Sequence, residues 1–276
     1  MSPLFLPGGW APYSTPLLEK PEHDMLSSMT ETTKTQEGRV SELFAVGAHF
    51  GYSPSRRHPS VAKYLFGVKG GTELFDLEKT AACLEDALGF IKTLSEGRKT
   101  VLFVGSKAEA REQVVRTAER LGQPYVASRW IGGSLTNFSE IKKRLGRLSE
   151  LSDMKEKGEL AKFTKHERLL IDREIDDLER MFGGLKGMPK LPDAVFIVDP
   201  KHESGVVAEA LQLNIPIVAI LNSDCNVAPI AHPIPANDAS RQTITCILEE
   251  VAKTYESNLG LAPAPEAPEP AAAPAQ

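Results

Sequence analysis

The stretch TVLFVGSKAEAREQVVRTAERLGQPYVAS, residues 100–128, determines the fold class that the sequence predicts. It contains two short apolar runs, TVLFVG and PYVAS, on either side of the segment 108–122. An apolar stripe at helical spacing runs through that segment and consists of Val114, Val115, Ala118 and Leu121. The glycine that ends the segment is a helix stop signal. A strand, a helix and a second strand in this order predict one unit of a parallel β-sheet.

Two further apolar runs extend this pattern toward the carboxyl end. DAVFIVD (193–199) and PIVAILN (216–222) are rich in Val and Ile, as strands covered by helices on both faces are. Between them, HESGVVAEALQLN (202–214) has the pattern of a helix, and a last helix is expected at 238–255. We therefore expect an α/β domain built on a doubly wound parallel sheet.

The segment 137–183 departs from the alternation of strands and helices. Two narrow apolar seams run through it, one at Phe138, Ile141, Leu145 and Leu148 and the other at Ile171, Ile175, Leu178 and Phe182. Charged residues occupy most of the remaining positions. Such seams on polar helices predict an antiparallel hairpin of coiled-coil type that projects from the domain, with its turn near Lys157 and Gly158. The alternative is a helical subdomain folded onto the sheet.

Both ends of the chain lack helical or strand periodicity. Residues 1–40 mix Pro, Gly, Ser and Thr, and residues 257–276 form a tail rich in Pro and Ala. We expect a disordered or extended amino-terminal extension and a flexible carboxyl-terminal spacer. The globular α/β domain then consists of residues 41–136 and 184–256, with the hairpin 137–183 inserted between them.

The composition is that of an ordinary globular protein, with 41% hydrophobic residues, 25% charged residues and a net charge of -5. No run approaches the roughly 18 apolar residues that a membrane span needs, and the amino end lacks the basic start of a signal peptide. We therefore expect a cytoplasmic protein. Its cysteines, Cys83, Cys225 and Cys246, are widely spaced, as in a reducing compartment. The acidic net charge does not exclude nucleic acid, because no acidic residue occurs between Ala45 and Thr72.

The sequence contains no motif for nucleotide-dependent catalysis. VGSK (104–107) ends a strand and opens a helix, but it lacks the GxxxxGK[ST] pattern that wraps a triphosphate. GxGxxG, GxSxG, HExxH and paired cysteines are missing as well. His202, Asp199, Asp224 and Cys225 lack recognisable metal-ligand spacing, so the sequence favours loop capping by the aspartates over a metal site. We expect no enzymatic activity and no cofactor.

A set of motifs resembles the bacterial small-subunit ribosomal protein S2 family. VGAHFGYSPSRRHPSVAKYLFG, DLEKT, VLFVGSK, RWIGGSLTNF, LPDAVFIVD and NIPIVAI occur in the family's order and approximate spacing, over about residues 41–256. RWIGGSLTNF (129–138) is the most specific of them. The resemblance implies a flavodoxin-like α/β domain with an inserted coiled-coil hairpin.

The resemblance also implies a structural role on the solvent side of the small subunit, near the head–body junction. The implied partners are 16S rRNA, neighbouring small-subunit proteins and the large mRNA-binding ribosomal protein built of repeated OB-type domains. Any structural magnesium would be held through the rRNA, and neither a membrane nor a small-molecule substrate is implied.

The basic residues in and beside these motifs are the expected rRNA contacts, because Lys and Arg bind backbone phosphates. They are Arg56, Arg57, His58, Lys63, Lys107, Arg129, Lys142, Lys143 and Arg144. Pro54 and Pro59 predict an extended loop for the first group, with Tyr64 and Phe66 anchoring the strand edge behind it. The alternatives are a basic loop that is merely solvated and, for Lys107, an ordinary surface lysine.

RWIGGSLTNF is expected to launch the hairpin and to make its base basic. Gly132 and Gly133 permit a positive φ in a sharp turn, and Thr136 or Asn137 caps the first helix. Trp130 has the area of a side chain that packs beneath the turn.

Two departures from the family pattern bear on function. NSDCNVAPIAHPIPAND (222–238) replaces a more acidic loop, and both chain ends are longer than the family core needs. The mixed charge of the outer hairpin is typical of a solvated surface or a protein contact. A non-ribosomal adaptor that uses the hairpin is therefore the alternative function, and a nucleotide-binding enzyme using the Gly105 or Gly132 loop is less favoured.

Overall fold

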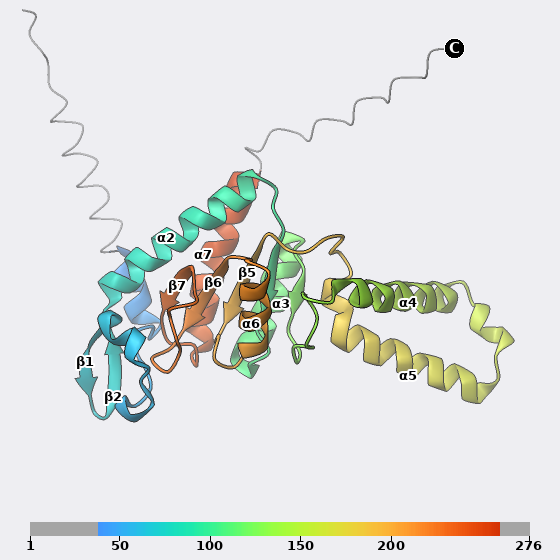
Figure 1. Ribbon diagram of the computed structural model, residues 1–276, viewed down its shortest axis with the longest axis horizontal. Helices are drawn as coiled ribbons and strands as arrows, with labels where there is room; N and C mark the ends of the chain where they lie inside the picture. Colours follow the sequence, from blue (N-terminus) through green and yellow to red (C-terminus); the bar gives the residue numbers. More distant parts are fainter. Residues whose placement is uncertain (1–37, 260–276) are drawn as a thin grey trace, which may run out of the picture. The chain divides into compact units, whose positions relative to one another are not determined.

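The computed structural model describes residues 38–259 (Figure 1). The expected amino-terminal extension and Pro/Ala tail therefore lie, apart from their inner ends, outside the described residues. Those inner ends are helical, because residues 38–45 form a helix and α7 (Arg241–Leu259) continues to the last described residue.

A five-stranded parallel sheet forms the centre of the domain, in the order β4-β3-β5-β6-β7. The strands are β3 (Val101–Val104), β4 (Tyr125–Val126), β5 (Ala194–Val198), β6 (Ile217–Leu221) and β7 (His232–Pro235). Every residue of the three inner strands is buried, which explains their continuously apolar sequences. In chain order, β3 comes first and lies inside the sheet, whereas β4 comes second and lies at its edge. The chain therefore extends the sheet in both directions from β3, which makes the sheet doubly wound. The predicted fold class is confirmed.

β7 is the strand of the central sheet that the sequence did not predict. It lies within NSDCNVAPIAHPIPAND, which was expected to be a loop, and it contains Pro233 and Pro235. Proline cannot donate a ladder hydrogen bond, but β7 is an edge strand and, among the described strands, pairs only with β6.

Helices cover both faces of the sheet. α2 (Leu77–Glu96), α3 (Ala108–Leu121) and α7 share one buried cluster with Val101 and Phe103 of β3. α6 (Ser204–Gln212) belongs to a second buried cluster on the opposite face of the sheet. This cluster contains Leu102 and Val104 of β3 and the base of the hairpin. The domain therefore has three layers, with the sheet between two apolar cores.

A small antiparallel sheet precedes the central one and consists of β1 (Leu65–Lys69) and β2 (Thr72–Phe75). The expectation of an extended loop before β1 is wrong, because the chain forms two 3₁₀ turns there, η1 (Pro54–Arg56) and η2 (Pro59–Tyr64). Each turn begins at a proline, whose fixed φ suits the first helical position. Phe66 is 80% exposed, so it does not anchor the strand edge.

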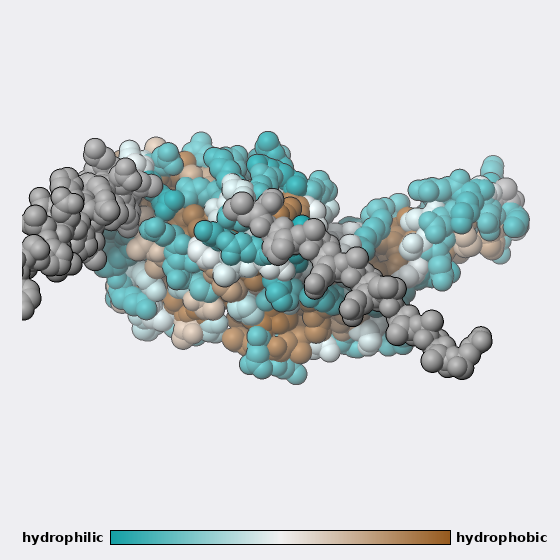
Figure 2. All heavy atoms as spheres, turned by 90° about the horizontal axis from the view of Figure 1, so that it is seen from above, coloured by the Kyte–Doolittle hydropathy of each residue, from teal (hydrophilic) through white to brown (hydrophobic). Residues whose placement is uncertain are grey.

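α4 (Phe138–Glu156) and α5 (Lys165–Phe182) form the predicted pair of helices and pack against each other (Figure 1). Their buried residues are Ile141, Leu148 and Leu151 on α4 and Ile175, Leu178 and Phe182 on α5. The connection contains Gly158, at a φ of 71°, and the 3₁₀ turn η3 (Glu159–Lys162). Hydrophilic residues cover most of the outer part of the pair (Figure 2). Coiled-coil packing of the two helices stays a prediction.

The base of the hairpin is fixed to the edge of the sheet. After α5 the short turn η4 (Gly183–Leu185) passes so close to β4 that a Cβ on Gly184 would lie 2.7 Å from Cδ2 of Tyr125. Ser128 donates a hydrogen bond of 2.9 Å from Oγ to the backbone oxygen of Arg180. The second helix thus returns directly onto the edge strand.

Candidate functional site

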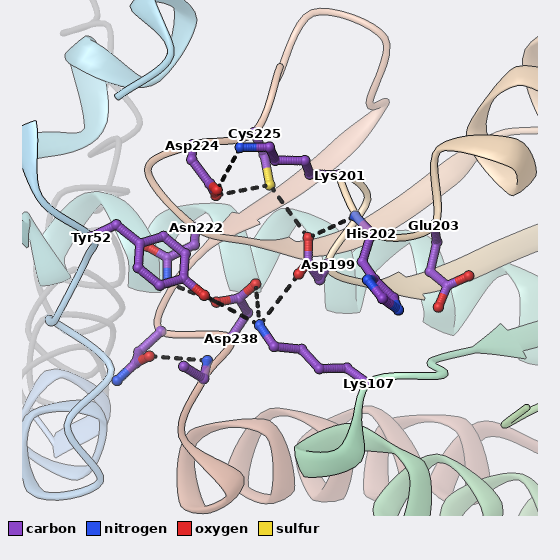
Figure 3. A network of polar contacts seen from close by, with 12 residues as sticks. Tyr52, Lys107, Asp199, Lys201, His202, Glu203, Asn222, Asp224, Cys225 and Asp238 are labelled. Carbon is purple, nitrogen blue, oxygen red and sulfur yellow. Dashed lines mark hydrogen bonds and ion pairs between the residues drawn. The ribbon is translucent and has the colours of Figure 1, made fainter. Parts of the chain in front are cut away.

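The carboxyl ends of the strands meet at one edge of the central sheet. β4 lies on one side of β3 and β5 lies on the other, so the crevice beyond β3 and β5 is a topological switch point. Doubly wound folds bind their ligands at this place. Four side chains from separate segments converge there, namely Tyr52, Lys107, Asp199 and Asp238 (Figure 3).

Lys107 is the only cation among these four side chains. Its Nζ lies 3.1 Å from Oδ2 of Asp238 and 3.3 Å from Oδ2 of Asp199. It also donates to the hydroxyl oxygen of Tyr52 at 3.3 Å, while Asn222 donates to Oδ1 of Asp238 at 2.7 Å. Burial alone would lower the pKa of Lys107, but the attraction of Asp238 and Asp199 outweighs burial and raises it. The positive charge of Lys107, which the sequence suggested for a phosphate contact, is therefore balanced by carboxylates of the protein itself.

A carboxylate also fills the loop before α3. Glu203 is buried, and its Oε1 accepts hydrogen bonds from the backbone N–H of Ser106, at 2.9 Å, and from the Ser106 hydroxyl. In nucleotide-binding α/β proteins a phosphate occupies this loop. Gly105 has a packing role here, because a Cβ at this position would lie 2.9 Å from Cγ2 of Val114. The switch point is therefore filled by groups of the protein itself.

Cys225 lies beside this cluster as a protonated thiol. Burial, followed by the negative charge of Asp199, raises its pKa to about 12, and only a thiolate is a good metal ligand. Asp199 accepts a hydrogen bond of 3.1 Å from the backbone N–H of His202, and Asp224 pairs with Lys201 at 2.8 Å. Asp199 thus caps the loop, as the sequence favoured. Among the residues that the structure describes, no three His, Cys, Asp or Glu side chains could hold a metal ion.

One carboxylate from α6 organises the loop that launches the hairpin. Oε1 of Glu209 accepts hydrogen bonds from the indole N–H of Trp130, at 2.9 Å, and from the backbone N–H of Gly133, at 2.8 Å. Oε2 accepts from the backbone N–H groups of Leu135 (2.9 Å) and Thr136 (3.1 Å) and from the Thr136 hydroxyl (3.2 Å). Burial alone would raise the pKa of Glu209, but these hydrogen bonds lower it. The loop is therefore folded around an internal negative charge.

Glu209 changes the roles expected for the motif residues. Gly133 has a φ of 87°, whereas Gly132 does not have a positive φ. Asn137 is the N-cap residue of α4 but its side chain forms no capping hydrogen bond, and Thr136 binds Glu209 instead. Trp130 is half-buried and lies against α6, where a Cβ on Gly205 would be 3.2 Å from the indole Cδ1. Contacts across the fold, rather than a local cap, hold this turn.

The basic loop before β1 is exposed and lies beside the switch point. The guanidinium of Arg56 lies 4.9 Å from the ring centre of Tyr52. Nη1 of Arg57 lies 3.4 Å from Oε1 of Glu73, whose side chain is fully buried. Arg56 and Arg57 are themselves exposed, so this loop presents two guanidinium groups to solvent.

The other two basic residues of this loop differ in exposure. His58 is half-buried and caps η2, because its Nδ1 accepts a hydrogen bond of 3.3 Å from the backbone N–H of Ser60. Lys63 is exposed, with its Nζ 4.8 Å from the ring centre of Tyr64.

A second exposed basic surface lies at the base of the hairpin. It consists of Arg129, Lys142, Lys143 and Arg144. Lys143 pairs with Glu140 at 2.6 Å, and Lys142 donates to a backbone oxygen at 3.4 Å. The side chains of Arg129 and Arg144 form no hydrogen bond or ion pair with any residue in the described part of the chain. Their guanidinium groups are free to bind an external anion.

A family model described as Ribosomal protein S2 matches residues 43–258. The chain is similar to the small ribosomal subunit protein uS2 of Chloroflexus aggregans (strain MD-66 / DSM 9485) and to that of Chloroflexus aurantiacus (strain ATCC 29366 / DSM 635 / J-10-fl). Each is 42% identical over 213 residues, which covers 77% of this chain and 90% of the relative.

Proposed function

The chain belongs to the ribosomal protein S2 family, and from this premise we propose that it binds 16S rRNA near the head–body junction and supports assembly of the small subunit. As a member of this family it is a structural constituent of the small ribosomal subunit and not an enzyme. Its localisation is the cytoplasm, on the ribosome. The structure contains no helix, within the residues described, that is long and apolar enough to cross a membrane.

The observation that carries the rRNA proposal is the pair of exposed basic surfaces. They comprise Arg56, Arg57 and Lys63 before β1 and Arg129, Lys142, Lys143 and Arg144 at the hairpin base. Lys107 is left out, because Asp199 and the buried Asp238 already balance its charge. His58 is assigned to capping its own turn. We further propose that residues 137–183 act as an inserted hairpin on the globular domain 41–136 and 184–256.

Replacing a single phosphate-binding arginine is expected to change the salt dependence of rRNA binding. In Arg56→Ala and in Arg144→Ala, the slope of log K against log salt should become less steep by about 0.9 for each phosphate that the protein no longer neutralises. The measurement is filter binding of the labelled protein to small subunits stripped of it, over a series of salt concentrations.

The matched control for this experiment is Lys92→Ala on α2. Lys92 has an exposed side chain, and its distance from Glu96 is 3.9 Å, so the change removes one positive charge from another face. Its slope should equal that of the wild type. Equal slopes for all four proteins would reject phosphate binding by Arg56 and Arg144.

We also propose that the large OB-repeat mRNA-binding protein docks at the apolar surface near β1. Phe66 and Val68 of β1 are 80% and 57% exposed, and Phe44 and Phe50 are 63% and 47% exposed. Phe50 forms an isolated bridge with Leu74 of β2. Exposed apolar side chains gathered at one end of a domain are typical of a protein–protein contact.

Phe66→Ser is expected to weaken binding of this partner by about tenfold to thirtyfold, as loss of an aromatic anchor does. Thermal stability should stay unchanged, because the Phe66 side chain is largely in solvent. The measurement is co-sedimentation of the purified partner with small subunits that carry either protein. Leu211→Ser, which removes a 46% exposed leucine from α6, is the control. Equal binding by the two variants would reject this docking surface.

A further inference from the structure

A groove of about 730 Å³ lies between the edge strand β4 and the carboxyl end of α5. Its apolar lining includes Val115 of α3, Ile131 after β4 and Met181 of α5, all half-buried, together with Tyr125. This volume is within the range of pockets that bind small organic groups. The groove is separate from the switch point and from the loop before β1.

The rim of this groove is strongly basic. Four of its lining residues are exposed cations, namely Arg111, Arg129, Arg180 and Lys186, and its single acid is Glu179. Glu179 is paired with Lys186 at 2.8 Å. The other three lining cations are guanidinium groups. Arg180 pairs with Asp177 at 2.7 Å, and Arg111 donates to the backbone oxygen of Ser106 at 3.1 Å. The side chain of Arg129 has no partner in the described part of the chain. An apolar floor is thus surrounded by a surplus of positive charge.

A second hollow of about 480 Å³ adjoins the first. The two hollows share Ile131 and Met181 in their linings. The second is also lined by Gly133, which Glu209 holds in place, and by Arg144, which is unpaired within the described residues. Apolar side chains therefore separate two neighbouring depressions, each with an arginine that forms no ion pair in the described part of the chain.

We propose that this groove binds an unpaired nucleotide of RNA, with the base on the apolar floor and the flanking phosphates on Arg129 and Arg111. The inference rests on the proposed function and assigns the groove to single-stranded rRNA. Bases that are not paired can enter apolar hollows, and guanidinium groups bind the phosphates on either side of them. Duplex RNA cannot do this, because its bases are stacked inside the helix.

An acidic peptide would also match the charge of the rim, but the geometry favours RNA. A peptide that binds in an extended form adds a strand to a free sheet edge. At β4 that edge is covered, since Gly184 lies directly against the backbone and ring of Tyr125. The groove therefore provides cations and an apolar floor, but no open row of backbone donors and acceptors.

The test is the binding of a fluorescein-labelled oligouridine of about eight nucleotides, compared with an RNA duplex of equal length, by fluorescence anisotropy. Ala127→Phe fills the groove without changing its charge, because Ala127 is a half-buried lining residue. It should weaken binding of the oligouridine by about tenfold and leave duplex binding unchanged. Arg129→Glu should weaken the binding of both the oligouridine and the duplex. Because Arg129 is exposed, this variant is expected to fold normally. Ala82→Phe, at an exposed site on α2, is the matched control.

Three results would overturn the inference. The first is equal oligouridine binding by the wild type and Ala127→Phe when both enter small subunits normally. The second is unchanged oligouridine binding by Arg129→Glu. The third is a poly-glutamate peptide that binds more tightly than oligouridine and is weakened more by Ala127→Phe, which would assign the groove to an acidic peptide. Failure of the wild type itself to bind stripped small subunits would instead contradict the proposed function.

Discussion

Lys107→Met is expected to destabilise the folded protein by about 3–5 kcal/mol, the range found when one partner of a buried ion pair is removed. The substitution retains most of the side-chain volume but leaves Asp199 and the fully buried Asp238 without their cation. Two carboxylates would then face each other in a crevice with little water. The measurement is the free energy of unfolding in urea, with circular dichroism to confirm native secondary structure before denaturation.

The destabilisation caused by Lys107→Met should be larger at pH 8 than at pH 5. In the native protein, burial and then repulsion by Asp199 already raise the pKa of Asp238. Loss of the lysine raises the folded-state pKa of Asp238 further, so the variant loses stability as the pH rises above the unfolded value of about 3.9. Protonation at low pH relieves the repulsion.

Lys99→Met is the matched control for this prediction. It breaks a Lys–Asp pair of 3.5 Å between Lys99 and Asp193, but the lysine side chain is half exposed. Exposed pairs contribute about 0–1 kcal/mol. A Lys107 variant no less stable than the Lys99 variant, or one with the opposite pH dependence, would show that the Lys107 cluster is not a buried ion-pair network.

Glu209→Ala is expected to lower the free energy of unfolding by about 3 kcal/mol and to loosen the loop that launches the hairpin. The substitution leaves the donors of Trp130, Gly133, Leu135 and Thr136 without their shared acceptor. A buried donor without a partner costs about 1–3 kcal/mol, and solvent will satisfy those that are exposed. Amide hydrogen exchange should accelerate at residues 133–136. This local measurement is needed because unfolding in urea reports only the stability of the whole domain.

Two comparisons separate this prediction from a general loss of charge. Glu209→Gln keeps one acceptor oxygen and should be intermediate in stability. Glu112→Ala removes an exposed acid on α3 that pairs with Arg241 at 3.3 Å, and it should change stability by less than about 1 kcal/mol. Unchanged exchange at residues 133–136 in Glu209→Ala would contradict the assigned role.

The inner strands could be predicted because burial on both faces leaves a local record in the sequence. β3, β5 and β6 are continuous apolar runs, and the predicted helices α3 and α6 lie within two residues of their expected bounds. β7 could not be found in the same way, because an edge strand tolerates proline and its short run, His232–Pro235, resembles a loop. The 3₁₀ turns before β1 were missed because proline suits both an extended loop and the start of a helical turn.

The candidate site was less predictable, because its contacts join residues far apart in the chain. Glu209 looks like any helical acid in the sequence, and its partners begin at Trp130. Lys107 follows a strand and precedes a helix, which locally predicts a phosphate contact, while the carboxylates that balance it follow β5 and β7. RWIGGSLTNF was identified as a structural motif, but the residue that holds it was not.

α7 completes one apolar core from the far end of the described chain. It packs against both α2 and α3, and Ser95 of α2 donates a hydrogen bond of 2.5 Å to the backbone oxygen of Tyr255. Because translation proceeds from the amino end, the apolar faces of α2 and α3 remain uncovered until α7 has left the exit tunnel. At about 5–20 residues per second, that interval is on the order of 10 s. During it the nascent chain exposes an incomplete core and is open to holding chaperones and to aggregation.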